Sequence, residues 1–294
     1  MPRIHCSILT PLPEDLDLVT KLRMIAEAGF DGVQAGPPSP AARASFADAV
    51  AEAGLEASAC GHLAEDRPAE PIFEAAAQAG MTSLNLQVDG YWRDDAWHDA
   101  RVRELITLSE KHELPFFLET HRHRMTQDPR RTLALLERHP DLRLCGDFSH
   151  YTSTCELVGP WAEEWRQMLH TIAARCGEVH IRLNNGQNIQ DPLCEIAPEQ
   201  QSEFLALWQA AGKQCPDLLH TTELLPASIG YDRPGRDVTN LGDIWSDSVQ
   251  LLSMLRAASP RLPTAADHRW SMSALPWRRP PRQPAMSPPS RSAA

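Results

Sequence analysis

The segment PFFLETH, residues 115–121, is a short apolar run that ends in a carboxylate and a histidine. Three later segments have a similar form: LCGDFSH at 144–150, EVHIR at 178–182 and HTTELL at 220–225. Each segment is typical of a buried strand that is followed by an ionisable side chain. A charged group directly behind buried residues is costly unless it is paired or metal-bound, so these strand ends are the first candidates for a functional site.

These segments belong to a series of eight predicted strands, which alternate with longer amphipathic stretches. The predicted strands are Arg3–Thr10, Gly32–Gly36, Leu55–His62, Ser83–Asp89, Pro115–His121, Leu142–His150, Glu178–Leu183 and Leu218–Leu225. Apolar stripes predict helices between them, the first with Leu16, Val19, Leu22 and Ile25 and the last with Ile244, Leu251, Leu252 and Leu255. Ala-Gly steps at 28–29, 53–54, 79–80 and 211–212 predict glycine C-caps.

Eight strand–helix units predict an all-parallel sheet that closes as a (β/α)₈ TIM barrel, a single α/β domain over residues 1–258. The alternative is a doubly wound open sheet, which would be expected to carry a glycine-rich phosphate loop. The sequence contains neither G-x-G-x-x-G nor G-x-x-x-x-G-K-[ST]. The barrel is therefore the favoured fold, and its active site is expected at the carboxyl ends of the strands.

Composition restricts the class of protein and of partner. The chain has 294 residues, 42% of them hydrophobic and 23% charged, with a net charge of −11. This balance is typical of a globular protein, and the acidic charge argues against nucleic acid as a partner. No apolar run approaches the roughly 18 residues of a membrane span. Residues 259–294, rich in proline and arginine, are predicted to form a disordered tail of unassigned role.

Two features favour a cytoplasmic location. The N-terminal segment lacks the apolar stretch of a signal peptide. The seven cysteines are scattered and form no C-x-x-C pair, which suits a reducing compartment better than a disulfide framework or a cysteine-rich zinc site.

The ionisable residues at the four strand ends are Glu119, Asp147, His180 and Glu223. Three carboxylates and one imidazole on consecutive strands would repel one another without a cation between them. Oxygen-rich ligands with one nitrogen suit Mn²⁺, Mg²⁺ or Co²⁺, and Zn²⁺ remains open. These four residues are therefore predicted to bind one divalent metal ion.

Neighbouring polar residues are candidates for substrate binding. Residues i and i+2 of a strand share a face, which places Arg182 beside His180 and His121 beside Glu119. His150 follows Asp147 by three residues, where the strand is expected to turn into its loop. We predict that Arg182 and His150 hold substrate oxygens, although Arg182 could instead pair with a carboxylate. His62 and His121 are further polar candidates.

In these segments, and in their order, the sequence resembles the xylose isomerase-like barrel superfamily, specifically its sugar phosphate isomerase/epimerase type. The matching elements are LETH at 118–121, GDFSH at 146–150, VHIR at 179–182 and TEL at 222–224, within residues 3–256. By likeness to the ketose 3-epimerases of that group, the resemblance implies that Glu119 and Glu223 bind the metal and also act as acid and base. It implies metal binding by Asp147 and His180, and substrate binding by His150.

The predicted function is that of a metal-dependent sugar isomerase or epimerase, which removes a proton next to a carbonyl through a metal-stabilised enediolate. A metal-dependent lyase, decarboxylase or hydrolase of an oxidised sugar is the main alternative. An endonuclease IV-like phosphodiesterase is less favoured, because Asp191-Pro192-Leu193 stands where an Asp-x-His pair would be needed. A non-catalytic sugar-binding barrel also stays open. The expected partner is a small sugar or sugar acid, and the oligomeric state stays open.

Overall fold

Eight parallel strands, each paired with the next along the chain, close into a barrel because β1 also pairs with β8. The structure is a computed structural model that describes residues 2–10, 16–226 and 241–258. The strands are β1 Arg3–Ser7, β2 Gly32–Ala35, β3 Glu56–Leu63, β4 Leu84–Val88, β5 Phe116–Glu119, β6 Leu144–Gly146, β7 Cys176–Ile181 and β8 Leu219–Thr222. The predicted (β/α)₈ TIM barrel is thereby confirmed.

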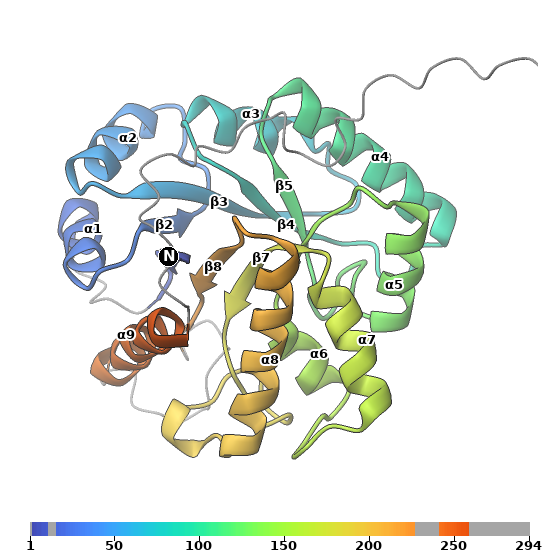
Figure 1. The fold of residues 1–294 in the computed structure, drawn as a ribbon. Coiled ribbons are helices and arrows are strands. Elements are labelled where there is room, and N and C mark those ends of the chain that lie inside the picture. The colour runs from blue at the N-terminus through green and yellow to red at the C-terminus, as the bar shows by residue number, and fades with distance from the viewer. Residues whose placement is uncertain (1, 11–15, 227–240, 259–294) are drawn as a thin grey trace, which may run out of the picture.

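The helices lie outside the ring of strands (Figure 1). They are α1 Leu18–Glu27, α2 Arg43–Glu52, α3 Glu70–Gln78, α4 Asp95–Lys111, α5 Pro129–Arg138, α6 Phe148–Thr154, α7 Glu163–Ala173, α8 Pro198–Gln214 and α9 Leu241–Ala258, with a 3₁₀ turn η1 at Leu193–Glu195. Asp17, Asp94, Asp128 and Asp147 cap the first turns of α1, α4, α5 and α6 by accepting backbone N–H bonds. None of the described helices is both long and apolar enough to cross a bilayer.

Polar side chains occupy part of the barrel interior. His5 Nδ1 in β1 lies 2.9 Å from Ser58 Oγ in β3. Gln34 in β2 donates to Glu178 in β7 at 2.5 Å, and because these strands are not neighbours the bond crosses the interior. The apolar core includes Leu84, Leu86, Val179 and Ile181, each completely buried. The interior is therefore a polar layer inside an apolar shell.

The predicted strand Leu142–His150 is wrong in its second half. β6 ends at Gly146, and the Asp147 carboxylate accepts from the Ser149 backbone N–H at 3.1 Å as the cap of α6. An aspartate is both a polar strand end and a strong helix N-cap, so the chain turns at once into a helix. His150 consequently lies in the first turns of α6, not where a strand becomes a loop.

Two details of the helix predictions are also wrong. Val19 is 39% exposed, because a stripe spaced every three residues drifts around a helix of 3.6 residues per turn. Leu16 precedes α1, because Asp17 caps the helix and α1 begins at Leu18. Gly212 lies inside α8, whereas Gly29, Gly54 and Gly80 follow their helices with positive φ, as predicted for C-caps. The stripe of α9 is confirmed, since Ile244, Leu251, Leu252 and Leu255 are buried. The predicted tail lies outside the described residues.

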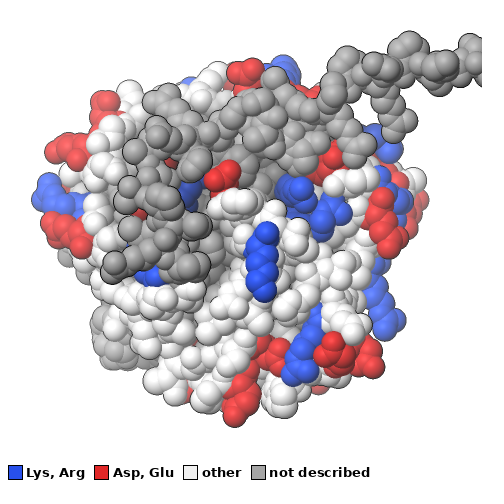
Figure 2. Space-filling view, in the orientation of Figure 1, with Lys and Arg blue, Asp and Glu red and all other residues white. Residues whose placement is uncertain are grey.

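Charged side chains of both signs are interspersed on the visible face of the molecule (Figure 2). Exposed ion pairs include Arg93 with Glu65 at 3.0 Å and Lys111 with Glu70 at 2.7 Å. Exposed pairs of this kind contribute little to stability, about 0–1 kcal/mol each. The barrel therefore depends on its buried layers for stability, not on its surface charges.

Close packing at β2 leads to a first prediction. A Cβ at Gly32 would lie 2.7 Å from the backbone oxygen of Glu56, whereas a Cβ at Gly36 would meet nothing within 4 Å. Overpacking of this kind typically costs about 1–3 kcal/mol. We expect Gly32→Ala to lower the urea midpoint of unfolding clearly and Gly36→Ala to leave it nearly unchanged. Equal midpoints for the two variants would contradict the tight β2–β3 packing.

Candidate active site

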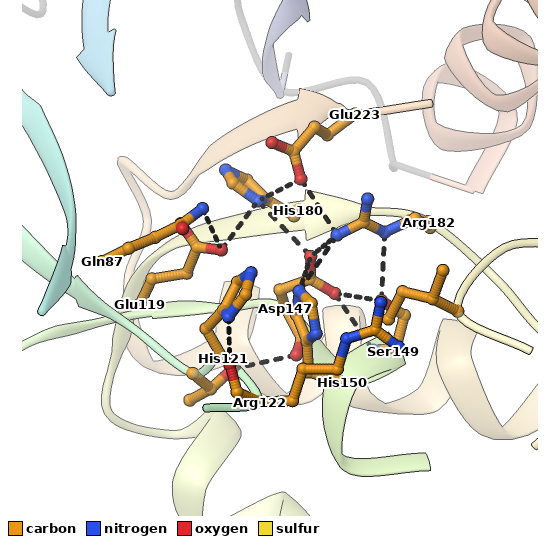
Figure 3. A network of polar contacts seen from close by, with 12 residues as sticks. Gln87, Glu119, His121, Arg122, Asp147, Ser149, His150, His180, Arg182 and Glu223 are labelled. Atoms are coloured by element: carbon orange, nitrogen blue, oxygen red, sulfur yellow. Dashed lines mark hydrogen bonds and ion pairs between the residues drawn. The ribbon is translucent and has the colours of Figure 1, made fainter. Parts of the chain in front are cut away.

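Glu119, Asp147, His180 and Glu223 meet at the carboxyl ends of four consecutive strands (Figure 3). Glu119 is the last residue of β5, Asp147 and Glu223 directly follow β6 and β8, and His180 lies within β7. All four are buried, and one possible ligand atom of each lies within 4.8 Å of the others. The structure therefore brings the four predicted metal ligands together.

The His180 ring is central to this group. Its Nδ1 lies 3.0 Å from Glu223 Oε2, 3.6 Å from Asp147 Oδ2 and 4.0 Å from Glu119 Oε1. Both His180 Nδ1 and Glu223 Oε2 are buried and form ion pairs with charged neighbours, but neither makes a hydrogen bond among the described residues. Buried polar atoms without hydrogen bonds, in a set of three carboxylates and one imidazole, fit a divalent cation.

The two glutamates differ in their affinity for protons. Burial is the largest cause that raises the pKa of Glu119, to about 8, and the neighbouring Glu223 carboxylate adds to it. Burial also opposes ionisation of Glu223, but His180 and Arg182 outweigh it and lower the pKa of this carboxyl. Without a metal ion the environment thus favours a proton on Glu119 and a charge on Glu223, whereas a bound divalent ion would favour the charged form of both carboxyls.

Arg182 is the principal positive charge beside the carboxylates. It directly follows β7, and its guanidinium, completely buried, contacts Asp147 and lies 3.1 Å from Glu223 Oε2. Its Nε also donates to Ser149 Oγ at 3.0 Å. Of the two interpretations left open by the sequence, the structure shows the pairing with carboxylates. A contact between Arg182 and a substrate stays a prediction.

His121 and His150 lie together at the edge of the cluster, with ring centroids 3.7 Å apart. His150 Nε2 lies 3.5 Å from Asp147 Oδ2 and 3.3 Å from Arg182. Burial is the main cause that lowers the pKa of both imidazoles, that of His121 to about 4. Both rings are thus neutral hydrogen-bonding groups beside the carboxylates, which suits the predicted contact with hydroxyl oxygens.

His62 lies apart from this cluster. It is the penultimate residue of strand β3, and its side chain is 49% exposed. Its Nε2 lies 2.9 Å from Asp89 Oδ1, which also pairs with Arg124 at 3.1 Å. A role for His62 in substrate binding therefore remains a prediction for the mouth of the barrel.

Sequence reasoning assigned no role to Asn85 and Gln87 of β4, although both hold Glu119. Asn85 donates to Glu119 Oε2 at 2.6 Å, and Gln87 donates to Oε1 at 3.2 Å. The signal was present in the sequence, because two amides alternate with apolar residues in LNLQV, residues 84–88, and so share one face. Amide donors on both oxygens fix the orientation of the Glu119 carboxylate.

No protein-family model and no curated protein matches the sequence. Solved structures do match it. The chain superposes on 3-keto-D-glucoside 4-epimerase YcjR from E. coli with a TM-score of 0.61 at 18% identity, covering 88% of this chain and 100% of that one. A xylose isomerase-like TIM barrel protein from Mycobacterium smegmatis matches with a TM-score of 0.56 at 15% identity, over 87% and 97% of the chains. This chain shares the TIM-barrel fold of these structures.

A third match has a different title. The probable 3-DHS dehydratase AsbF from Bacillus anthracis gives a TM-score of 0.61 at 15% identity, covering 86% of this chain and 99% of that one. At such low identities the matches establish the fold alone. The resemblance noted in the sequence is thus borne out at the level of architecture, and the chemistry has to be argued from the site.

Arg182 leads to a second prediction. Replacing it by leucine leaves the buried Asp147 and Glu223 carboxylates without their guanidinium, which typically costs about 3–5 kcal/mol. We expect Arg182→Leu to unfold at a clearly lower urea concentration in EDTA, with partial recovery when Mn²⁺ is added. Arg182→Lys should fall between the leucine variant and the wild type. Unchanged unfolding of Arg182→Leu in EDTA would contradict this account of the site charge.

Proposed function

We propose that the protein is a divalent-metal-dependent isomerase or epimerase that acts on a sugar or sugar acid. The observation that carries the proposal is the convergence of Glu119 and Glu223 with Asp147 and His180 at the carboxyl ends of the barrel strands. That end of a TIM barrel is where enzymes of this fold carry their active sites. The similarity to a fold neighbour described as a sugar epimerase supports the substrate class.

Glu119, Asp147, His180 and Glu223 would hold the metal ion. When bound, a divalent ion that chelates a carbonyl and its neighbouring hydroxyl makes the adjacent C–H more acidic. Mn²⁺, Mg²⁺ and Co²⁺ are the cations that the donor set favours, with Zn²⁺ as a further candidate.

The protein's own part is the transfer of the proton. Glu119 ends β5 and Glu223 directly follows β8, and both carboxylates lie within 4.0 Å of His180 Nδ1. Two carboxylates from different strands are therefore available to one substrate. One removes a proton, and the other returns a proton to the opposite face or to the neighbouring carbon. Asn85 and Gln87 orient Glu119 for this task, and Arg182 keeps Glu223 ionised.

His121 and His150 are proposed to bind substrate hydroxyls. Their neutral imidazoles can each donate one hydrogen bond and accept another, which suits the hydroxyl groups of a sugar. Arg182 would contact the substrate from the β7 side, and His62 from the mouth of the barrel.

A lyase is the second candidate, favoured by the match to a structure titled as a probable dehydratase. Removal of a proton next to a carbonyl also begins the elimination of water, so the same carboxylates serve both reactions. The phosphodiesterase alternative lacks support in the site. Asp191 accepts from the Asn185 backbone N–H and the Asn188 amide, both at 2.8 Å, and belongs to no metal-binding group of the described residues.

The acid/base roles lead to a third prediction. Glu119→Gln and Glu223→Gln each remove a proton carrier but keep the size of the side chain, so we expect kcat to fall by about 10²–10⁴-fold. Ketoses, aldoses and sugar acids are first screened in D₂O by NMR for C–H exchange, and the variants are then assayed on the substrate found. Glu110→Gln, at an exposed position of α4, is the matched control. Near-wild-type turnover by both site variants would disprove the mechanism.

The metal site leads to a fourth prediction. Elemental analysis should find about one divalent ion per chain in the wild type and none in a Glu119→Ala/Asp147→Ala variant, because half of the ligand set is removed. Dialysis against EDTA should abolish turnover, and Mn²⁺ or Mg²⁺ should restore it. A wild type that binds no metal after reconstitution would leave the sugar-binding barrel as the remaining interpretation.

A further inference from the structure

The two nitrogens of the His180 ring have different surroundings. Nδ1 points to the carboxylates of the cluster, whereas Nε2 lies 3.7 Å from Glu178 Oε1 and 3.3 Å from Asn85 Nδ2. A histidine that binds a metal through one nitrogen carries its proton on the other. If Nδ1 is the donor to the metal, the proton is on Nε2 and requires an acceptor.

Glu178 supplies the carboxyl acceptor on that side of the ring. The nearest atom of Asn85 is an amide nitrogen, which donates one hydrogen to Glu119 Oε2 at 2.6 Å and can donate the other to Nε2 only while the ring proton is on Nδ1. It cannot accept a hydrogen bond from Nε2–H. Cys145 Sγ lies in the same group with Glu178 and His180, but a thiol is a weak acceptor. A carboxylate is a much stronger acceptor for an imidazole N–H.

The Glu178 side chain is fixed in place by two strands. Its Oε1 accepts from Gln34 of β2 at 2.5 Å and from Thr221 of β8 at 2.8 Å. The residue is completely buried, and its Oε2 has no hydrogen-bond partner among the described residues. Burial of a carboxyl is costly, and neither Gln34 nor Thr221 is charged, so the adjacent imidazole is the group that accounts for a carboxyl at this position.

We propose that Glu178 is a positioning residue for His180: its carboxylate accepts a hydrogen bond from the Nε2–H of the metal-loaded site and so keeps Nδ1 directed at the metal. The role rests on the proposed function, because it requires the metal site. Glu178 and His180 are two residues apart on β7 and share one face, so the strand itself sets their distance. A carboxylate behind the imidazole also makes the ring a stronger donor to the metal.

The test is the Mn²⁺ affinity of the full chain, measured by EPR detection of free Mn²⁺. Loss of such a partner typically weakens metal binding by about 10–100-fold. We expect Glu178→Leu to bind Mn²⁺ about 100-fold more weakly than the wild type and Glu178→Gln, which keeps an acceptor oxygen, about 10-fold more weakly. Ser58→Ala is the matched control, since Ser58 is buried in the same barrel and bonds to His5. It should bind Mn²⁺ like the wild type.

A second readout separates positioning from general stability. In the Mg²⁺-loaded wild type, ¹⁵N-edited NMR should detect a slowly exchanging His180 Nε2–H. The signal should keep its position in Ser58→Ala and move upfield in Glu178→Leu, because a hydrogen bond to a carboxylate shifts an imidazole N–H resonance downfield. A loss of stability alone would not shift the resonance of one ring proton in a folded protein.

The outcomes separate this inference from the proposed function. Wild-type Mn²⁺ affinity in Glu178→Leu, with the Nε2–H resonance at its wild-type position, overturns the role of Glu178 and leaves the metal site intact. If the leucine variant does not fold, wild-type affinity in Glu178→Gln overturns the role in the same way. A wild type that binds no Mn²⁺ overturns both proposals.

Discussion

Three carboxylates buried within one small volume are the constraint on which the rest of the site depends. Glu119, Asp147 and Glu223 would repel one another strongly in a barrel that excludes water, so positive charge has to accompany them. Arg182 supplies one positive charge, and a divalent ion would supply two more, which together balance three carboxylates. In the absence of a metal, His180 takes up part of this task, because Cys145, Glu223 and Glu119 raise its pKa well above the ordinary value against the effect of burial.

Different strands of the barrel supply different groups of the site. The strands β5 to β8 carry the four predicted ligands, while β4 supplies the amides that orient Glu119. The strand β2 contributes from the far side of the interior, where Gln34 anchors Glu178. Closure of the sheet is what makes such contacts possible, since β2 and β7 would be far apart in an open sheet. The polar interior is therefore a support for the site and not a defect of the core.

The sequence predicted the fold and the four central residues because both follow from local patterns. Alternation of short apolar runs with amphipathic stretches identifies the strands. The first polar residue after the run identifies Glu119 and Asp147, whereas Glu223 comes after His220, Thr221 and Thr222. What could not be predicted depends on closure of the barrel. Arg182 lies beside Glu223 because β7 and β8 are paired in register. Glu178 accepts its hydrogen bond from Gln34 across the barrel interior. The predicted strand extended past the true end of β6 for a local reason. Asp147 directly follows the strand and at the same time caps the helix α6.

The same geometry bears more directly on the type of reaction than on the identity of the substrate. The carboxylates proposed to move protons lie buried at the strand ends, held by neighbours from β4, β7 and β8. His62, which pairs with Asp89 and through it with Arg124, is half exposed and lies outside the buried cluster. A change of substrate would alter groups such as these without disturbing the buried charges. Fold neighbours titled as an epimerase and as a probable dehydratase are consistent with this division, since both reactions can begin with removal of a proton next to a carbonyl. On this view the buried carboxylates determine the first chemical step, and the residues at the mouth determine which molecule undergoes it.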